Sequence, residues 1–185
     1  TLLIKNANCI APMTREDTPL LQNSSILVHD NRIEAIGPAE DLPDTADEVI
    51  DARGYILIPG MVNTHHHFYQ TLTRNLPAAQ DSNLFNWLVT HYPVWARMDG
   101  QAIDISTRIA IAELMLSGCT TAADHTYIWP NDACVDQQIA AAAEMGFRFH
   151  ASRGSMSVGE SQGGLPPDHA VEDEDFILSD SQRVI

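Results

Sequence analysis

The fold is decided by the stretch Tyr55-Ile56-Leu57-Ile58-Pro59-Gly60-Met61-Val62-Asn63-Thr64-His65-His66-His67. Its apolar part is typical of a buried strand. Because a strand points alternate side chains to one face, we expect His65 and His67 to project together and His66 to point away. Imidazole is the commonest ligand for zinc and related ions, so the pair predicts a metal site. The alternative is a set of surface or hydrogen-bonded histidines.

The composition is that of an ordinary globular protein, with 185 residues, 44% of them hydrophobic and 19% charged. The 25 acidic residues outnumber the 10 basic ones, and the formal net charge is −15. A field of this sign repels phosphate backbones, so we expect no nucleic-acid partner. The acidic cluster at 172–175 reads as solvated surface.

Cysteine usage and hydropathy indicate the compartment. The three cysteines are widely spaced and form no C-x-x-C pair, which favours a reduced, cytoplasmic setting. The first residues lack the features of a signal peptide, and no apolar stretch approaches the length of a membrane span. We therefore expect a cytoplasmic protein without a membrane partner.

The chain is expected to contain two domains, residues 1–58 and 59–185. In the first, strands at 25–29 and 32–36 flank Asp30-Asn31, a pair suited to a tight hairpin turn. Strands at 49–51 and 55–58 flank another turn, which ends in Gly54. This pattern predicts a small β module.

The second domain alternates strands with helices. We expect helices at 83–97, 99–117 and 135–145, strands at 120–124 and 147–151, and a last helix from 175 that has no C-terminal cap, so that the chain ends mid-fold. The alternation favours parallel β/α units. Polar residues that follow the strands should then share one edge, where β/α barrels build active sites. These residues are His65, His67, Asp124, His125 and Arg153.

Two side chains, those of Gln70 and Arg153, are candidates for binding a substrate. Gln70 lies three residues beyond His67, and its amide can donate to and accept from the edge of a purine-like ring. Arg153 could bind a ring carbonyl through its fork of donors. The alternatives are a surface residue at a helix start for Gln70 and a structural ion pair for Arg153.

Other polar and aromatic features have simpler interpretations. The glycine-rich segment 152–167 is either a lid or binding loop or a loose connector. His91 and His169 look like surface residues. The three tryptophans are interpreted as packing residues.

The order of these motifs resembles the amidohydrolase superfamily. The resemblance rests on Pro59–His67 and Gly118–Asp124, and within the superfamily the branch that deaminates nucleobases and s-triazines is most similar. The segments 65–74, 153–157 and 163–168 resemble 8-oxoguanine deaminases in particular.

The resemblance implies an α/β fold, a (β/α)8 TIM-like barrel of which 59–185 supplies about the first three β/α units. A full barrel needs roughly 250 residues. Residues 1–58 would form a small, incomplete β-sandwich module, completed by residues from the far C-terminus. The implied cofactor is one Zn2+ ion, or Fe2+, bound by His65 and His67. The remaining ligands and the acid and base groups would lie beyond Ile185, so no catalytic residue is expected within this chain.

The implied activity is hydrolytic deamination of an amino-substituted heteroaromatic base, with 8-oxoguanine as the first candidate and ammonia as a product. The partner would be a small nucleobase-like molecule, and a homo-oligomer is expected. Hydroxytriazine and guanine or pterin aminohydrolases remain open, as do a binuclear cyclic-amide hydrolase and a non-catalytic metal-binding scaffold. Deaminases with H-x-E and P-C-x-x-C motifs are excluded, because the chain has neither pattern.

Overall fold

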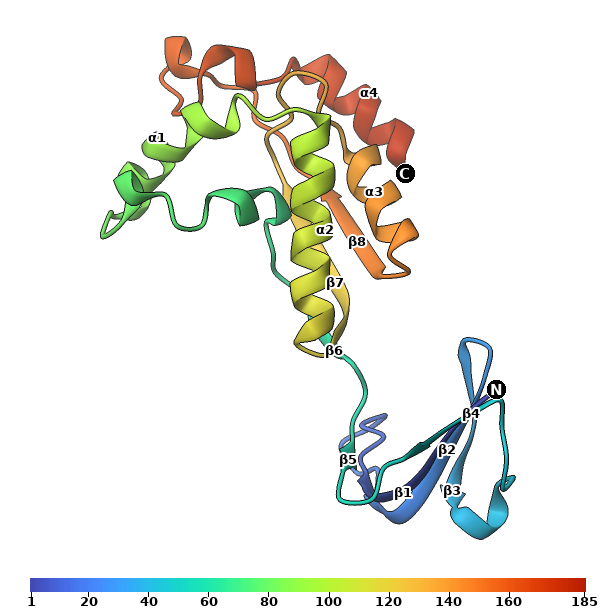
Figure 1. Cartoon of the computed structure of the whole chain (residues 1–185). Helices are drawn as coiled ribbons and strands as arrows, with labels where there is room; N and C mark the ends of the chain where they lie inside the picture. Colours follow the sequence, from blue (N-terminus) through green and yellow to red (C-terminus); the bar gives the residue numbers. More distant parts are fainter. The chain divides into compact units, whose positions relative to one another are not determined.

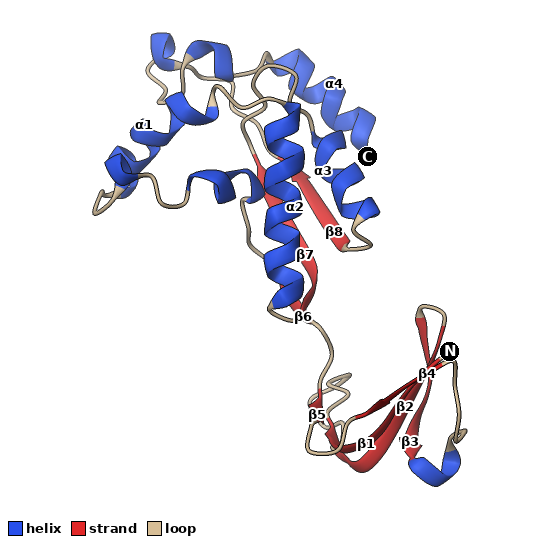
Figure 2. Cartoon of the chain, viewed as in Figure 1, coloured by secondary structure: helices blue, strands red, loops and turns tan.

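The computed structural model describes residues 1–185 and divides them into two compact units, Thr1–Pro59 and Gly60–Ile185. The expected boundary lies one residue before this division. The first unit consists mainly of strands, and the second alternates strands with helices, so the chain is a mixed α/β protein (Figure 1, Figure 2). No helix combines the length and the apolar character that crossing a membrane requires.

The first unit is one five-stranded sheet in the order β3-β2-β1-β4, with β5 also paired to β1. The predicted hairpin is confirmed, because β2 and β3 pair antiparallel around Asp30, whose φ is 51°. A sandwich of two sheets stays a prediction. The elements are β1 (Leu2–Ile10), β2 (Leu21–His29), β3 (Arg32–Pro38), β4 (Glu48–Asp51), β5 (Ile56–Leu57) and the short 3₁₀ helix η1 (Ala39–Asp41).

The turn at Gly54 does not make a hairpin. Both β4 and β5 pair parallel with β1, one after the other along its length. Between them the chain leaves the ladder, and the Gly54 N–H donates to the Asn8 side-chain oxygen at 2.8 Å. Glycine suits this position because its φ of 87° is costly for other residues.

The second unit is built on a parallel sheet in the order β6-β7-β8. The expected helices and strands are confirmed to within a few residues, whereas closure into a barrel stays a prediction. The elements are β6 (Met61–Asn63), β7 (Cys119–Thr126), β8 (Arg148–Arg153), α1 (Leu84–Trp95), α2 (Gly100–Leu116), α3 (Val135–Glu144), α4 (Glu174–Val184), and the 3₁₀ helices η2 (Phe68–Thr73), η3 (Pro77–Ala79), η4 (Glu160–Gln162) and η5 (Asp168–Ala170).

The apolar run 55–64 is not one strand, which corrects the sequence-based expectation. It is interrupted at Pro59-Gly60, so that β5 pairs with β1 of the first unit and β6 pairs with β7 of the second. Proline has no N–H to donate to a strand ladder, which explains the interruption. The histidines that follow belong to the second unit.

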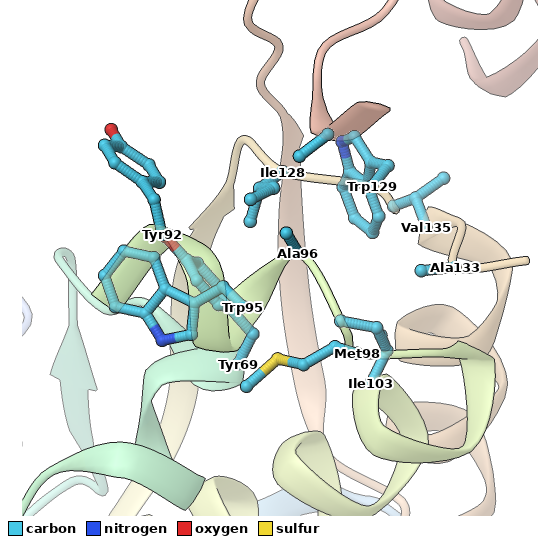
Figure 3. Close-up of a cluster of buried hydrophobic side chains, with 11 residues drawn as sticks. Tyr69, Tyr92, Trp95, Ala96, Met98, Ile103, Ile128, Trp129, Ala133 and Val135 are labelled. Carbon is cyan, nitrogen blue, oxygen red and sulfur yellow. The ribbon is translucent and has the colours of Figure 1, made fainter. Parts of the chain in front are cut away.

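Two buried clusters hold the second unit together. One packs α2 and α3 against a face of the sheet and includes Ile111, Ala122 and Ala142. The other joins α1 to the segment after β7 and contains Trp95 and Trp129 (Figure 3), with Trp87 packed against it, which confirms the packing interpretation of the tryptophans. This cluster also includes Tyr69, which follows the three histidines by two residues in the sequence.

His91 is buried, which makes its assignment to the surface wrong. Only 1% of the residue is exposed, and Nδ1 lies 2.8 Å from the Trp87 carbonyl oxygen. Its ring lies 4.2 Å from the Trp87 ring, measured between centroids. The aromatic neighbours of α1 therefore make this histidine part of the core.

Candidate functional site

The three histidines follow β6 in the loop before η2. The ring centroids of His65 and His67 lie 5.2 Å apart with the ring planes perpendicular, whereas His66 packs against Phe68 with centroids 4.8 Å apart. The ring contacts of His65 and His67 thus differ from those of His66, although β6 itself ends at Asn63 and all three residues line one hollow. The Asn63 side-chain oxygen accepts the His65 N–H at 2.9 Å and supports the turn out of the strand.

The end of β7 fixes the backbone and one ring of this motif. The His125 N–H donates to the His66 carbonyl oxygen at 2.9 Å, and His67 Nδ1 lies 2.5 Å from the His125 carbonyl oxygen. A carbonyl can only accept, so Nδ1 carries the proton and Nε2 keeps its lone pair. A histidine that donates from one nitrogen to a carbonyl is the usual arrangement of a metal ligand.

The pair fits part of a metal site. Two imidazoles on one tetrahedral zinc ion hold their ring centroids about 5 Å apart, which matches the separation of His65 and His67. His65 is exposed and His67 is half-buried, so both are open to an ion from solution. No third histidine, cysteine, aspartate or glutamate joins them in a cluster suited to a metal.

Gln70 lies in the same hollow as the two histidines. This open hollow of about 260 Å³ is lined by His65, His66, His67, Gln70, Thr71 and Arg74. Gln70 Nε2 lies 3.1 Å from the Tyr69 hydroxyl and 3.5 Å from the Tyr127 hydroxyl. The structure thus brings the predicted substrate residue together with the predicted metal ligands.

Asp124 is a buried carboxylate behind the motif and is only 1% exposed. Oδ1 accepts the Phe68 N–H at 2.5 Å, and Oδ2 accepts from Thr126 and from Gln138, both at 2.8 Å. Burial raises the pKa of Asp124, and these hydrogen bonds oppose the rise. The sequence predicted Asp124 at the edge of the sheet, but Gln138 was not among the predicted site residues. It could have been found as the one amide among the apolar residues on the buried face of α3.

Arg153 lies at the same edge of the sheet and forms ion pairs with two carboxylates. Its side chain is 5% exposed. Nη2 and Nη1 donate to the two Glu172 carboxylate oxygens at 2.5 and 2.8 Å, and Nε donates to Asp180 at 2.9 Å. The guanidinium also lies 5.9 Å from the Trp129 ring centroid. A substrate contact of Arg153 stays a prediction, and these contacts favour the structural alternative.

The glycine-rich segment after β8 is folded onto its neighbours. The Gly154 N–H donates to the Thr126 carbonyl oxygen at 2.8 Å, and a Cβ at this position would overlap the His125 ring. Farther along, Glu160 bonds to Pro166 and Gly164 to Gly159 through their backbones, each at 2.9 Å. The segment is thus no loose connector, whereas its role as a lid stays a prediction.

The chain is similar to known enzymes along most of its length. The model of the family described as "Amidohydrolase family" matches residues 56–183. The 8-oxoguanine deaminase of Pseudomonas aeruginosa is 46% identical over 163 residues, which cover 86% of this chain and 36% of that protein. The hydroxydechloroatrazine ethylaminohydrolase of Pseudomonas sp. (strain ADP) is 39% identical over 90% of this chain and 37% of its own length.

Among solved structures, the atrazine chlorohydrolase TrzN of Arthrobacter aurescens TC1, complexed with zinc, is similar over the whole chain. The TM-score is 0.87 at 31% identity, and 42% of that protein is covered. The chain therefore spans well under half of the length of the relatives that it matches.

Proposed function

The chain belongs to the amidohydrolase family, and from this premise we propose that the full-length protein is a zinc-dependent hydrolytic deaminase of an amino-substituted heteroaromatic base. The first candidate substrate is 8-oxoguanine, with ammonia as a product. Support comes from the relative that is 46% identical and from the second relative, an aminohydrolase. A homo-oligomer in the cytoplasm remains part of this proposal.

His65 and His67 would hold the metal, either zinc or Fe2+. A divalent ion lowers the pKa of water toward neutrality and so supplies the nucleophile for attack on the carbon that bears the amino group. The protein prepares His67 for this role, because the bond from Nδ1 to the His125 carbonyl leaves Nε2 free to bind. Residues beyond Ile185 would supply the remaining ligands and the acid that protonates the ring.

Gln70 would orient the substrate. Its amide lies in the hollow of the two histidines and can pair with a ring carbonyl or a ring N–H. Arg153 would reach the substrate only by releasing Glu172 or Asp180, so we assign the contact to Gln70 first and to Arg153 second.

The observation that carries the proposal is the placement of His65, His67 and Gln70 around one hollow after a parallel strand. The test is ammonia release by the full-length protein with 8-oxoguanine, guanine, isocytosine and a hydroxytriazine. We expect turnover of at least one of them, with 8-oxoguanine the fastest. Silence on all four together with hydrolysis of a cyclic amide would assign the protein to the binuclear class instead. Metal binding without any turnover would indicate a scaffold.

A second candidate is an aminohydrolase of a hydroxytriazine. It is favoured by the relative from Pseudomonas sp. (strain ADP) and by the similarity to TrzN. The same residues would bind the metal and the ring in both cases, so the sites are shared. The ratio of kcat/KM for the hydroxytriazine and for 8-oxoguanine decides between the two.

A further inference from the structure

Two consecutive residues of β7, Asp124 and His125, hold His66, His67 and the next residue, Phe68. The His125 backbone accepts from the His67 ring and donates to the His66 carbonyl, as described above. The Asp124 carboxylate accepts the N–H of Phe68, the residue that directly follows His67. Both peptide groups that flank His67 are therefore held by the end of the neighbouring strand.

The Asp124 carboxylate is itself fixed from two sides. Thr126 and Gln138 donate to the same oxygen, and Gln138 also donates to the Thr126 hydroxyl at 3.0 Å. All three residues are at most 1% exposed. A buried carboxylate is costly unless it is fully hydrogen-bonded, and here β7 and α3 supply these bonds.

The bond to Phe68 also determines where η2 begins. Phe68 is the first residue of this 3₁₀ helix, so the carboxylate satisfies an N–H that no residue within the helix can bind. Gln70 lies on the same helix, two residues later. One side chain thus sets the direction of the chain on both sides of Phe68, toward His67 and toward Gln70.

We propose that Asp124, braced by Thr126 and Gln138, is a positioning residue that sets the geometry of the metal ligand His67 and of the substrate residue Gln70. This inference rests on the proposed function and deepens it, since Asp124 would act through His67 and Gln70 rather than bind the metal or the substrate itself. Partners that orient metal ligands typically change metal affinity about 10- to 100-fold when they are lost. We expect an effect of this size at Asp124.

The test is the variant Asp124→Asn in the full-length protein. The asparagine keeps the shape and an oxygen for Phe68, but its NH₂ group faces the donors of Gln138 and Thr126. We expect zinc affinity, measured by chelator competition well below the unfolding temperature, to fall about 10- to 100-fold. The visible spectrum of the Co2+-substituted protein should change as well, because the position of His67 changes.

A matched control separates positioning from stability. Ser24 is 3% exposed in β2, which belongs to the first unit, and its hydroxyl donates to the Gln22 carbonyl oxygen at 2.9 Å. The variant Ser24→Ala should lower Tm and leave zinc affinity and the Co2+ spectrum unchanged. Adding Gln138→Glu to Asp124→Asn restores the donor and acceptor pattern, so this double variant should regain most of the zinc affinity.

The outcomes distinguish this inference from the proposed function. A wild-type protein that binds no zinc would overturn both. Zinc binding by the wild type with equal affinity in Asp124→Asn would overturn this inference alone, as would an equal loss of affinity in Ser24→Ala. If Asp124→Asn does not fold, Thr126→Val, which removes one donor and keeps the carboxylate, takes its place. Unchanged affinity in that variant would then contradict the inference.

Discussion

Polar side chains lie at the carboxyl ends of both β6 and β8 in one parallel sheet. Those that follow β6 are open to solvent, whereas the one that ends β8 is buried and ion-paired. After β6, His65 is exposed, and Gln70 and His67 line an open hollow. At the end of β8, the Arg153 side chain is 5% exposed, and its guanidinium forms ion pairs with Glu172 and Asp180.

The difference shows that position at the carboxyl edge of a sheet does not by itself make a residue functional. A side chain can bind a ligand only with donors or acceptors that the protein leaves free. His67 keeps Nε2 because its other nitrogen faces a carbonyl oxygen, whereas the donors of Arg153 are shared between Glu172, Asp180 and a backbone oxygen. We therefore expect substitutions after β6 to affect metal and turnover, and substitutions after β8 to affect mainly stability.

The largest effect is expected from replacing His65 and His67 together. The full-length variant with His65→Ala and His67→Ala should lose stoichiometric zinc in elemental analysis and with it all measurable deamination, since each imidazole supplies a ligand. His66→Ala is the matched control, because its ring packs against Phe68, and this variant should keep its metal. Unchanged metal content in the folded double variant would rule this site out.

The second-largest effect is expected from replacing Arg153, which should lower the free energy of unfolding. In Arg153→Ala, the Glu172 side chain, 10% exposed, loses its partner, and Asp180, 11% exposed, keeps only Arg183. Removing one member of a buried pair costs about 3–5 kcal/mol. Denaturant unfolding of the full-length protein measures this loss.

The matched control for Arg153→Ala is Arg53→Ala. The Arg53 side chain is 77% exposed beside Asp51, so its replacement should leave the free energy of unfolding almost unchanged. Wild-type stability combined with a reduced kcat/KM in Arg153→Ala would show that the arginine binds substrate after all.

A smaller effect is expected at Gln70. If its amide orients the ring, Gln70→Ala should cost about 1–3 kcal/mol of transition-state stabilisation, the scale of an unpaired buried polar group. Zinc content should stay at the wild-type level. The measurement is kcat/KM together with elemental analysis, and wild-type kinetics would mean that the pocket is built by other residues.

The smallest expected effect is on the stability of the fold at low pH. Arg183 bonds to Asp136 at 2.7 Å and lowers the pKa of that carboxyl to about 2. A lowered pKa stabilises the fold above the ordinary value of 3.8, and this contribution is lost as the pH falls from there toward about 2. Because Asp136 is 53% exposed, the contribution is below about 1 kcal/mol.

Arg183→Ala should therefore flatten the dependence of unfolding free energy on pH in this window. Burial alone would raise the pKa of Asp180, but the bonds from Arg153 and Arg183 hold it below its ordinary value, so Asp180 adds to the same loss. Parallel pH curves for variant and wild type would contradict the assignment.

The features that could be predicted from the sequence are local. The Asp99 side chain accepts the Ala102 N–H, and Gly118 has a φ of 83° where α2 ends; both residue types are typical of these positions at helix ends. The pairing of the His65 and His67 rings, two residues apart, was likewise expected from the order of the residues. Both depend on neighbours within a few residues.

The features that the sequence could not provide depend on distant partners. Glu172 belongs to an acidic cluster interpreted as solvated, yet it pairs with Arg153, 19 residues away. His91 is buried where α1 meets the segment that ends η2, and its Nε2 lies 3.3 Å from the carbonyl oxygen of Thr73, 18 residues away. Likewise, β4 and β5 pair with β1, which begins at Leu2. Periodicity indicates that a residue lies on a face but not what covers that face.

The central claim is that metal held by His65 and His67 drives deamination. The most direct test measures zinc content and ammonia release from 8-oxoguanine on one preparation of the full-length protein, before and after removal of metal by a chelator and again after zinc is restored. We predict that activity disappears with the metal and returns in proportion to the zinc regained. Full activity in the metal-free protein would contradict the account.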